Sequence, residues 1–125
     1  ERVAQMKKRE MQVLLHNCGN NRILMDQLIE AGIQCYQSIQ SNAGMDIGEL
    51  KAEFGSKLAF WGGMPVELLI MGTPEEVRKA VRKTLEIAAP GGGFIFGPSH
   101  SIAYGTKYEN FMAMLEEFDS LRDKY

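Results

Sequence analysis

The chain has 125 residues, of which 45% are hydrophobic and 24% are charged, and its formal net charge at pH 7 is −2. These values predict one globular domain that covers residues 1–125. Its lysines and arginines are spread along helical segments beside glutamates, so the sequence favours neither nucleic acid nor an anionic membrane as a partner. The apolar runs are shorter than the roughly 20 residues that span a bilayer, and no signal-peptide pattern is present, so we expect a cytoplasmic protein.

The first third of the chain alternates helix-like and strand-like segments. A charged helical segment begins at Glu1 without an initiator methionine, and we therefore expect a piece of a longer protein. A strand is predicted over 13–15, followed by a helix over 21–31 with apolar residues at helical spacing. Gly32 is the expected stop of that helix, and a second strand follows over 34–39.

Capping patterns mark the next two helices. Asp46 is expected to cap a helix that ends at Phe54, while Glu49 reaches back to the cap. After a third strand over 58–61, Gly62 and Gly63 are expected to open a long loop that runs to Gly72. Thr73, Pro74 and Glu76 then form the clearest helix start in the sequence.

The end of the chain repeats the same alternation. Pro90 and the glycines after it terminate the preceding helix, and a fourth strand is predicted over 94–96. Thr106 and Glu109 repeat the capping pattern for a last helix. The apolar residues that this helix would lay on the sheet are Phe111, Leu115 and Phe118.

Four βα units in succession predict an α/β fold with a parallel sheet. A closed (β/α)8 barrel, the TIM barrel, takes about 250 residues, so the chain corresponds to half of one. Half a barrel exposes two strand edges. Three arrangements are compatible with them: a second copy of the chain pairs with the edges, an N-terminal half completes the barrel, or the sheet stays open. A flavodoxin-like sheet, with another strand order, is the alternative fold.

Candidate metal ligands lie where two of these strands end. His16 and Cys18 follow the first strand and are two positions apart, a spacing that points both side chains the same way. His100 follows the fourth strand, and the loops after parallel strands carry the chemistry of barrel enzymes. The three side chains are therefore candidates for one pocket. Cys35, the other cysteine, is expected to be an inert buried thiol.

Residues after the second and third strands are candidates for substrate binding. Gln37 is positioned to hydrogen-bond a ligand, or equally only to finish a loop. Trp61 with Gly62 and Gly63 would let a large planar ligand approach the backbone. An aromatic that merely fills a barrel, followed by a flexible turn, is the alternative interpretation of these three residues.

Segments along the whole chain share their order and spacing with one superfamily. They are KKREMQVLLHNCGN, DQLIEAGIQCYQSIQ, MDIGELKAEFGSKLAFWGGM, GTPEEVRKAV, PGGGFIFGPSHSI and YENFMAMLEEF. On these segments the chain resembles the C-terminal half of the uroporphyrinogen decarboxylase superfamily. That resemblance implies a barrel fold and one of two chemistries: cofactor-free decarboxylation of a tetrapyrrole, or zinc-dependent transfer of a methyl group from a corrinoid to a thiol.

The local residues bear on the choice between these chemistries. Decarboxylases of the superfamily typically have an aspartate where this chain has Cys18, whereas the methyltransferases carry a histidine, any residue and a cysteine, as in His16 to Cys18. The methyltransferases have a further cysteine where this chain has His100, and a histidine there is also found in the decarboxylases.

The resemblance thus implies a zinc ion held by His16, Cys18 and His100, with a fourth position open for a thiol. A corrinoid, carried by a partner protein or bound as a substrate, would be the methyl donor. A decarboxylase in which His100 acts on a tetrapyrrole carboxylate, and a non-catalytic half-barrel module that forms a homodimer, are the alternatives.

Overall fold

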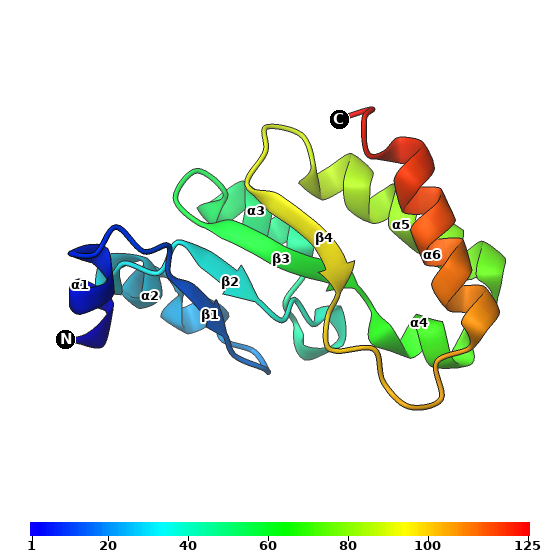
Figure 1. Cartoon of the computed structure of the whole chain (residues 1–125), viewed down its shortest axis with the longest axis horizontal. Coiled ribbons are helices and arrows are strands. Elements are labelled where there is room, and N and C mark those ends of the chain that lie inside the picture. Colours follow the sequence, from blue (N-terminus) through cyan, green and yellow to red (C-terminus); the bar gives the residue numbers. More distant parts are fainter.

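The structure, a computed structural model, describes all residues from 1 to 125. Its centre is a parallel sheet of four strands in the order β1-β2-β3-β4 (Figure 1). The strands are β1 (Leu14–His16), β2 (Cys35–Gln37), β3 (Ala59–Met64) and β4 (Phe94–Pro98). Strands that follow one another in sequence are therefore neighbours in space. This order is that of successive barrel units and confirms the predicted half-barrel over the flavodoxin-like alternative, in which the strand order is permuted.

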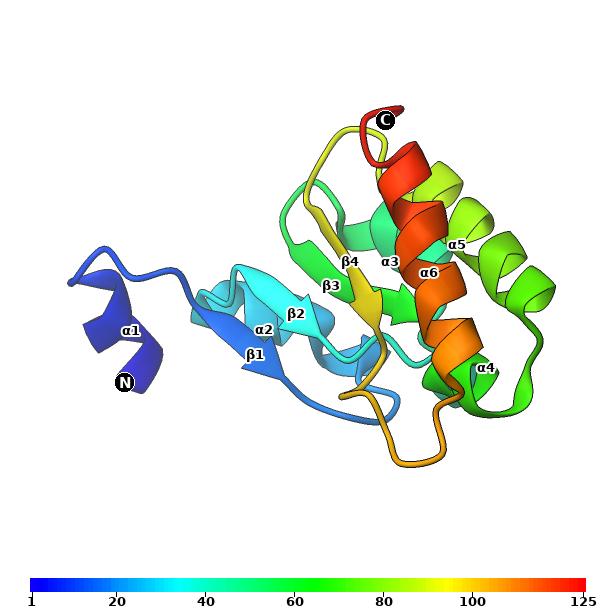
Figure 2. The same ribbon diagram turned by 45° about the vertical axis from the view of Figure 1, so that its right-hand side comes forward.

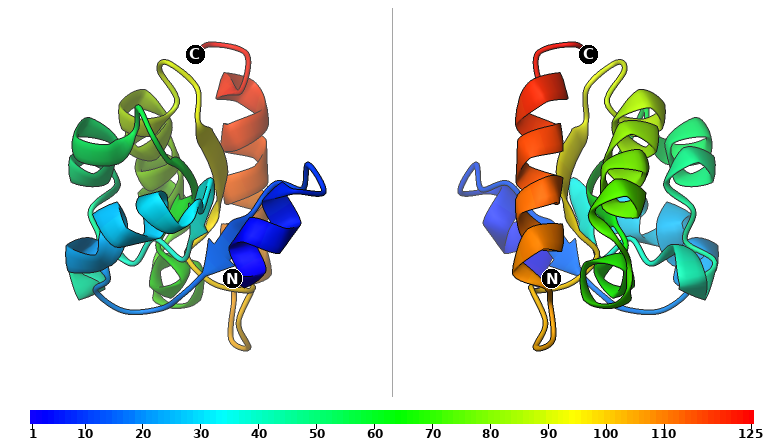
Figure 3. Two further views of the ribbon diagram at one scale, coloured as in Figure 1. Left: turned by 90° about the vertical axis from the view of Figure 1, so that its left-hand side faces the viewer. Right: turned by 90° about the vertical axis from the view of Figure 1, so that its right-hand side faces the viewer.

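Helices connect successive strands. The α-helices are α1 (Arg2–Lys7), α2 (Met25–Ala31), α3 (Ile47–Phe54), α4 (Val66–Met71), α5 (Pro74–Ala88) and α6 (Tyr108–Leu121), and the 3₁₀ turns are η1 (Arg22–Leu24) and η2 (Ser41–Ala43). Figure 3 shows α2, α3 and α5 along one side of the sheet. The last helix, α6, lies against α5 beside the β4 edge (Figure 2). No helix is both long and apolar enough to cross a lipid bilayer.

Two clusters of buried side chains join the helices to the sheet. The first core cluster lies between β1 to β3 and the helices α2 and α3 and includes Val13, Met25, Ile33, Tyr36, Ile39, Met45, Ile47, Leu50, Phe54, Leu58, Phe60 and Ala88. The second core cluster lies among α4, α5 and α6 and consists of Met64, Leu69, Val77, Val81, Leu85, Ala113 and Met114. Phe94 of β4 packs against both clusters and so couples them.

The other face of the sheet is open. Along one row of the sheet, His16 pairs in register with Gln37, Gln37 with Trp61, and Trp61 with Ile95. Trp61 is 38% exposed and Ile95 49%, although both are large apolar side chains. In a closed barrel this face is the filled interior, so these residues are exposed here because only half of the barrel wall is present.

Most of the predicted helix signals are confirmed. Gly32 ends α2 in a left-handed conformation with φ of 96°. The Asp46 carboxylate accepts hydrogen bonds from the backbone amides of Gly48 and Glu49 at the start of α3. Thr73 and Glu76 form a capping box before α5. The expectation that Glu49 would reach back to its cap is wrong, because its carboxylate bonds Arg22 instead.

The predicted loop after the third strand is also wrong. The strand continues through Gly62 and Gly63 to Met64, with Gly62 in register with Phe96 and Gly63 with Gly97 of β4. Pairing with β4 provides hydrogen-bond partners for backbone groups that a loop at these positions would leave without partners in the sheet. The segment that follows is the helix α4, formed because Leu69 can bury its side chain in the second core cluster.

The last helix differs from the prediction in where it begins and in which side chains face the sheet. The α6 helix begins at Tyr108, and Lys107 occupies its N-cap without a side-chain hydrogen bond. The Thr106 hydroxyl is buried without a hydrogen-bond partner and does not cap the helix. The predicted inward face holds for Phe118, which stacks on Phe96 of β4, but Leu115 points to solvent.

Candidate functional site

Three predicted site residues meet at the carboxyl end of the sheet. The Cys18 Sγ atom lies 3.3 Å from Nε2 of His16 and 3.3 Å from Nε2 of His100, although Cys18 and His100 are 82 residues apart. Because β1 and β4 are the two outer strands, three strand spacings, about 14 Å in a flat sheet, separate them. The curl of the sheet and the loops after both strands therefore bring these side chains together.

A buried tyrosine holds the loop that carries Cys18. The Tyr36 hydroxyl donates to the Asn17 carbonyl at 2.6 Å, and the Asn21 amide donates both to that hydroxyl and to the Cys18 carbonyl at 2.9 Å. Burial raises the pKa of Tyr36, so its hydroxyl stays protonated and donates. At Gly19, where φ is 86°, the backbone amide donates to Gln40. We call Tyr36, Asn21 and Gln40 the loop clamp.

Each of the three site residues also has a further polar neighbour. Nδ1 of His16 contacts the side-chain oxygen of Gln37. Nδ1 of His100 faces the Ser99 hydroxyl at 3.5 Å, and the Ser38 hydroxyl donates to Cys18 Sγ at 3.6 Å. Ser38 is fully buried with φ of 87°, a conformation rare outside glycine that recurs at functional sites.

Sequence reasoning missed the serines and the loop clamp. Ser38 directly follows β2 and Ser99 directly follows β4, yet serine at the end of a strand is ordinary in loops. No spacing rule links Tyr36 to Asn21, because their contact depends on how β2 lies beside the loop after β1. Gln37 is predicted as a polar residue near the end of the second strand, and the structure adds that it lies in register with His16.

The donor atoms suit zinc in kind, and the two distances from the sulfur to the imidazole nitrogens are near those that a zinc site requires. Zinc is bound by cysteine sulfur at about 2.3 Å and by histidine nitrogen at about 2.0–2.1 Å, so tetrahedral coordination places such atoms about 3.5 Å apart. Both Cys18 to histidine distances are 3.3 Å. The imidazole centroids of His16 and His100 are 6.3 Å apart, however, and as they stand the side chains do not enclose a metal-sized point. The two rings would have to turn toward each other around the sulfur to bind an ion.

The predicted substrate-binding residues divide between the two faces of the sheet. Gln37 and Trp61 lie in the open row beside His16. Gly97 makes room for the indole, because a Cβ atom there would lie 3.0 Å from Trp61 Nε1. Gly62 is buried against Ile39, and Gly63 accepts a hydrogen bond from Thr84 of α5 on the helix side.

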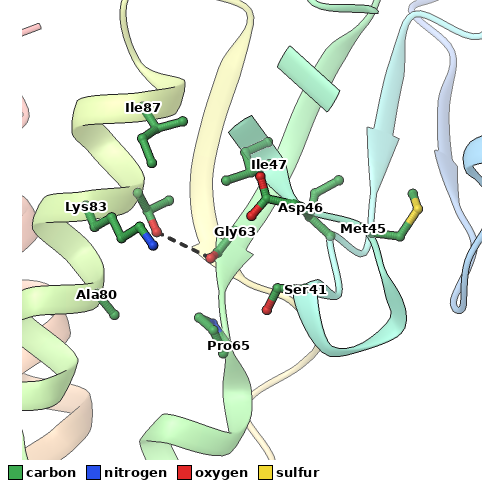
Figure 4. A pocket seen from close by; sticks show the side chains of 11 residues that line it. Ser41, Met45, Asp46, Ile47, Gly63, Pro65, Ala80, Lys83 and Ile87 are labelled. Atoms are coloured by element: carbon green, nitrogen blue, oxygen red, sulfur yellow. Dashed lines mark hydrogen bonds between the residues drawn. The ribbon is translucent and has the colours of Figure 1, made fainter. Parts of the chain in front are cut away.

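A cavity of about 210 Å³ lies on that helix side, between the start of α3 and α5 (Figure 4). Gly63, Asp46 and Lys83 are among its lining residues, together with apolar side chains from both helices. Neither Cys18 nor either histidine lines it. The cavity is therefore separate from the cluster of site residues at the carboxyl end of the sheet.

A family model described as "Uroporphyrinogen decarboxylase (URO-D)" matches residues 1–121. The chain belongs to the uroporphyrinogen decarboxylase family. It is 35% identical over 81 residues to uroporphyrinogen decarboxylase of Methylobacillus flagellatus, an alignment that covers 65% of this chain and 23% of that protein. It is 27% identical over 117 residues to the enzyme of the same name from Saccharophagus degradans, covering 94% of the chain and 32% of the enzyme.

Methyltransferases are also among the proteins that this family member resembles. It is 28% identical over 101 residues to the methylated-thiol–coenzyme M methyltransferase of Methanosarcina mazei, which covers 80% of the chain and 25% of that protein. A solved structure of a methyltransferase from Methanosarcina mazei matches with a TM-score of 0.76 and 20% identity, over 97% of the chain and 35% of that structure. This second likeness shows the fold alone. The chain spans about a quarter to a third of the length of these relatives.

Proposed function

We propose that this chain carries the zinc site of a methyltransferase-like member of the family, in which His16, Cys18 and His100 hold the metal. The contact of one sulfur with both imidazoles, at 3.3 Å each, is the observation that supports this proposal best. The likeness to a methylated-thiol–coenzyme M methyltransferase agrees with it. The activity of the whole protein, and its action in the cytoplasm, belong to the same proposal.

Three protein ligands leave a fourth position open, which is the arrangement of catalytic zinc sites. Zinc bound there would supply a Lewis acid that lowers the pKa of an acceptor thiol. A corrinoid would supply the methyl group. His16, Cys18 and His100 would hold the zinc at which the acceptor thiol loses its proton to solvent, and the cobalt would keep the electron pair of the cobalt–carbon bond when the methyl group passes to the sulfur.

The chain's own residues set the charge and surroundings of this site. With zinc bound, Cys18 would contribute one negative charge as a thiolate ligand, whereas the two imidazoles would be neutral ligands. The site would therefore be more positive than one with two thiolates, and its bound thiol less nucleophilic. The exposed indole of Trp61 and the neighbouring Gln37 offer an apolar surface and an amide to a ligand, with Gly62 and Gly63 behind them.

Zinc content tests this proposal directly. We expect about one zinc per chain in the wild type after loading and dialysis, and a loss of bound zinc in Cys18→Ala because the only thiolate of the site is removed. Cys35→Ala is the matched control, since Cys35 lies on β2 outside the contacts of the site. Metal analysis of the three proteins, with circular dichroism to check folding, gives the answer. Equal and negligible zinc in all three would contradict the proposal.

A decarboxylase is the second candidate, supported by the curated decarboxylases that the chain resembles. In that function, His100 would position or protonate a carboxylate of a tetrapyrrole, and no metal would be needed. Negligible zinc together with binding of a porphyrinogen analogue that weakens in His100→Ala would favour this candidate. Absence of both activities would leave a non-catalytic half-barrel, with the open face of the sheet as the surface of a homodimer.

A further inference from the structure

The contact between His16 and Gln37 is set by the register of the sheet. The two residues pair directly across β1 and β2; the side chain of His16 is exposed and that of Gln37 is half-buried on the open face. Neighbouring strands are about 4.8 Å apart, a gap that the glutamine side chain crosses to bring its oxygen against His16 Nδ1. Trp61 stands on the other side of Gln37 in the same row, so the glutamine lies between an imidazole and an indole.

This contact bears on which nitrogen of His16 carries the proton. In a neutral imidazole one nitrogen is a donor and the other an acceptor, and the oxygen of an amide can only accept. With Nδ1 donating to Gln37, the proton stays on Nδ1 and the lone pair stays on Nε2. That nitrogen is the one that lies 3.3 Å from Cys18 Sγ.

The second histidine of the site lacks such a partner. Nδ1 of His100 faces the Ser99 hydroxyl, which can donate or accept, at the longer distance of 3.5 Å. The two histidines thus reach the same sulfur through the same nitrogen, but only His16 has a neighbour that selects its tautomer. His100 therefore serves as an internal comparison for any measurement on His16.

We propose that Gln37 is a positioning residue that fixes His16 as the Nδ1–H tautomer and aims its Nε2 lone pair at the site. The consequence for metal binding rests on the proposed function, because it needs zinc to be the ligand. Partners of this kind, which accept from the second nitrogen of a metal-ligating histidine, orient the ring and raise its basicity. Gln37 then acts on the ligand through His16 and does not contact it.

The tautomer can be measured without any metal. In the ¹⁵N-labelled, zinc-free chain, above the pH at which histidine titrates, long-range ¹H–¹⁵N spectra distinguish a protonated Nδ1 from a protonated Nε2. We expect wild-type His16 to be protonated on Nδ1, Gln37→Leu to move the proton largely to Nε2, and Gln37→Glu to keep it on Nδ1. Gln27→Leu, on the exposed face of α2, is the control for a glutamine change that leaves His16 alone.

Zinc affinity supplies the second readout. We expect Gln37→Leu to weaken zinc binding by roughly 10- to 100-fold at unchanged stoichiometry, with the affinity rescued in Gln37→Glu. An unchanged His16 tautomer in folded Gln37→Leu would overturn the inference, and so would an unchanged affinity in a chain that binds zinc. If no variant binds zinc but the tautomer moves, the proposed function fails while the positioning role of Gln37 is supported.

Discussion

The two core clusters hold the two ends of the sheet in different ways. Around the first, the helices are short, with seven residues in α2 and eight in α3, and α2 has no side-chain cap. Around the second, α5 has 15 residues and α6 has 14, and α5 begins with a capping box. Arg82 of α5 also bonds the buried carboxylate of Glu117 in α6 at 2.9 Å.

This contrast bears on how the residues of the site are held together. His16 and Cys18 belong to the end of the sheet with short helices, whereas His100 follows β4 at the end with long ones. Neither α5 nor α6 carries a residue of the site, so the links between these two helices do not by themselves fix the distance from His100 to Cys18. That distance depends on the sheet itself, on Phe94 between the clusters, and on the loop clamp around Tyr36.

The largest expected effect comes from breaking the first core cluster. Phe60 of β3 is fully buried in that cluster, so we expect Phe60→Ala to lower the free energy of unfolding by about 3–5 kcal/mol. Because Phe94 joins both clusters, the loss should appear as one shifted transition. Denaturant unfolding followed by circular dichroism measures it.

Trp61, the next residue along β3, is the matched control. Its side chain lies on the open face and is partly exposed, so Trp61→Ala should cost much less than Phe60→Ala. Two separate transitions in Phe60→Ala would show that the clusters unfold independently. In that case the second core cluster would unfold as a unit of its own, and the two ends of the sheet would differ in stability more than their contacts indicate.

An intermediate effect is expected from the loop clamp. Tyr36→Phe removes the hydroxyl that donates to the Asn17 carbonyl and accepts from the Asn21 amide, so the carbonyl loses its donor and the amide loses one of its acceptors. We expect a loss of about 1–3 kcal/mol in the free energy of unfolding, measured by denaturant titration. The backbone amide of Gly19 should also exchange with solvent faster, since the loop is held less firmly.

Tyr104→Phe provides the comparison for this variant, because Tyr104 is fully exposed and its hydroxyl has no partner in the chain. It should leave both the stability and the Gly19 exchange rate unchanged. An equal, negligible effect of the two variants would mean that the loop after β1 keeps its conformation without the Tyr36 hydroxyl.

Sequence and structure agree where the signal is local. The capping box of Thr73 and Glu76, the cap at Asp46 and the stop at Gly32 each depend on residues within one helical turn, so their patterns sufficed. The convergence of the candidate ligands was also accessible, because the carboxyl ends of parallel strands share one edge of a sheet.

Long-range pairing explains the errors. Gly62 and Gly63 have the local pattern of a loop, and only their pairing with β4 makes them strand residues. Similarly, the left-handed backbone at Ser38 and the clamp at Tyr36 arise from contacts between segments that are distant in the chain. Such contacts leave no periodicity or spacing in one sequence.

The smallest expected effect concerns the capping box at the far end of the molecule. The Thr73 backbone amide and hydroxyl both donate to the Glu76 carboxylate, at 2.8 and 3.0 Å, and these bonds lower the pKa of Glu76 below its ordinary value of 4.5. Between the two pKa values the unfolded chain binds more protons than the folded one, so stability falls on acidification. Glu76→Gln should therefore be slightly less stable than the wild type at neutral pH, and the difference should vanish as the pH drops through the lowered pKa.

Glu75→Gln is the control, because the Glu75 carboxylate pairs with Arg82 on the exposed surface and takes no part in the capping box. Its stability should show no such pH-dependent difference from that of the wild type. Thermal unfolding of the three proteins between pH 3 and pH 7 gives the comparison; a difference that persists at the acid end would assign the stabilisation to the shape of the side chain and not to its charge.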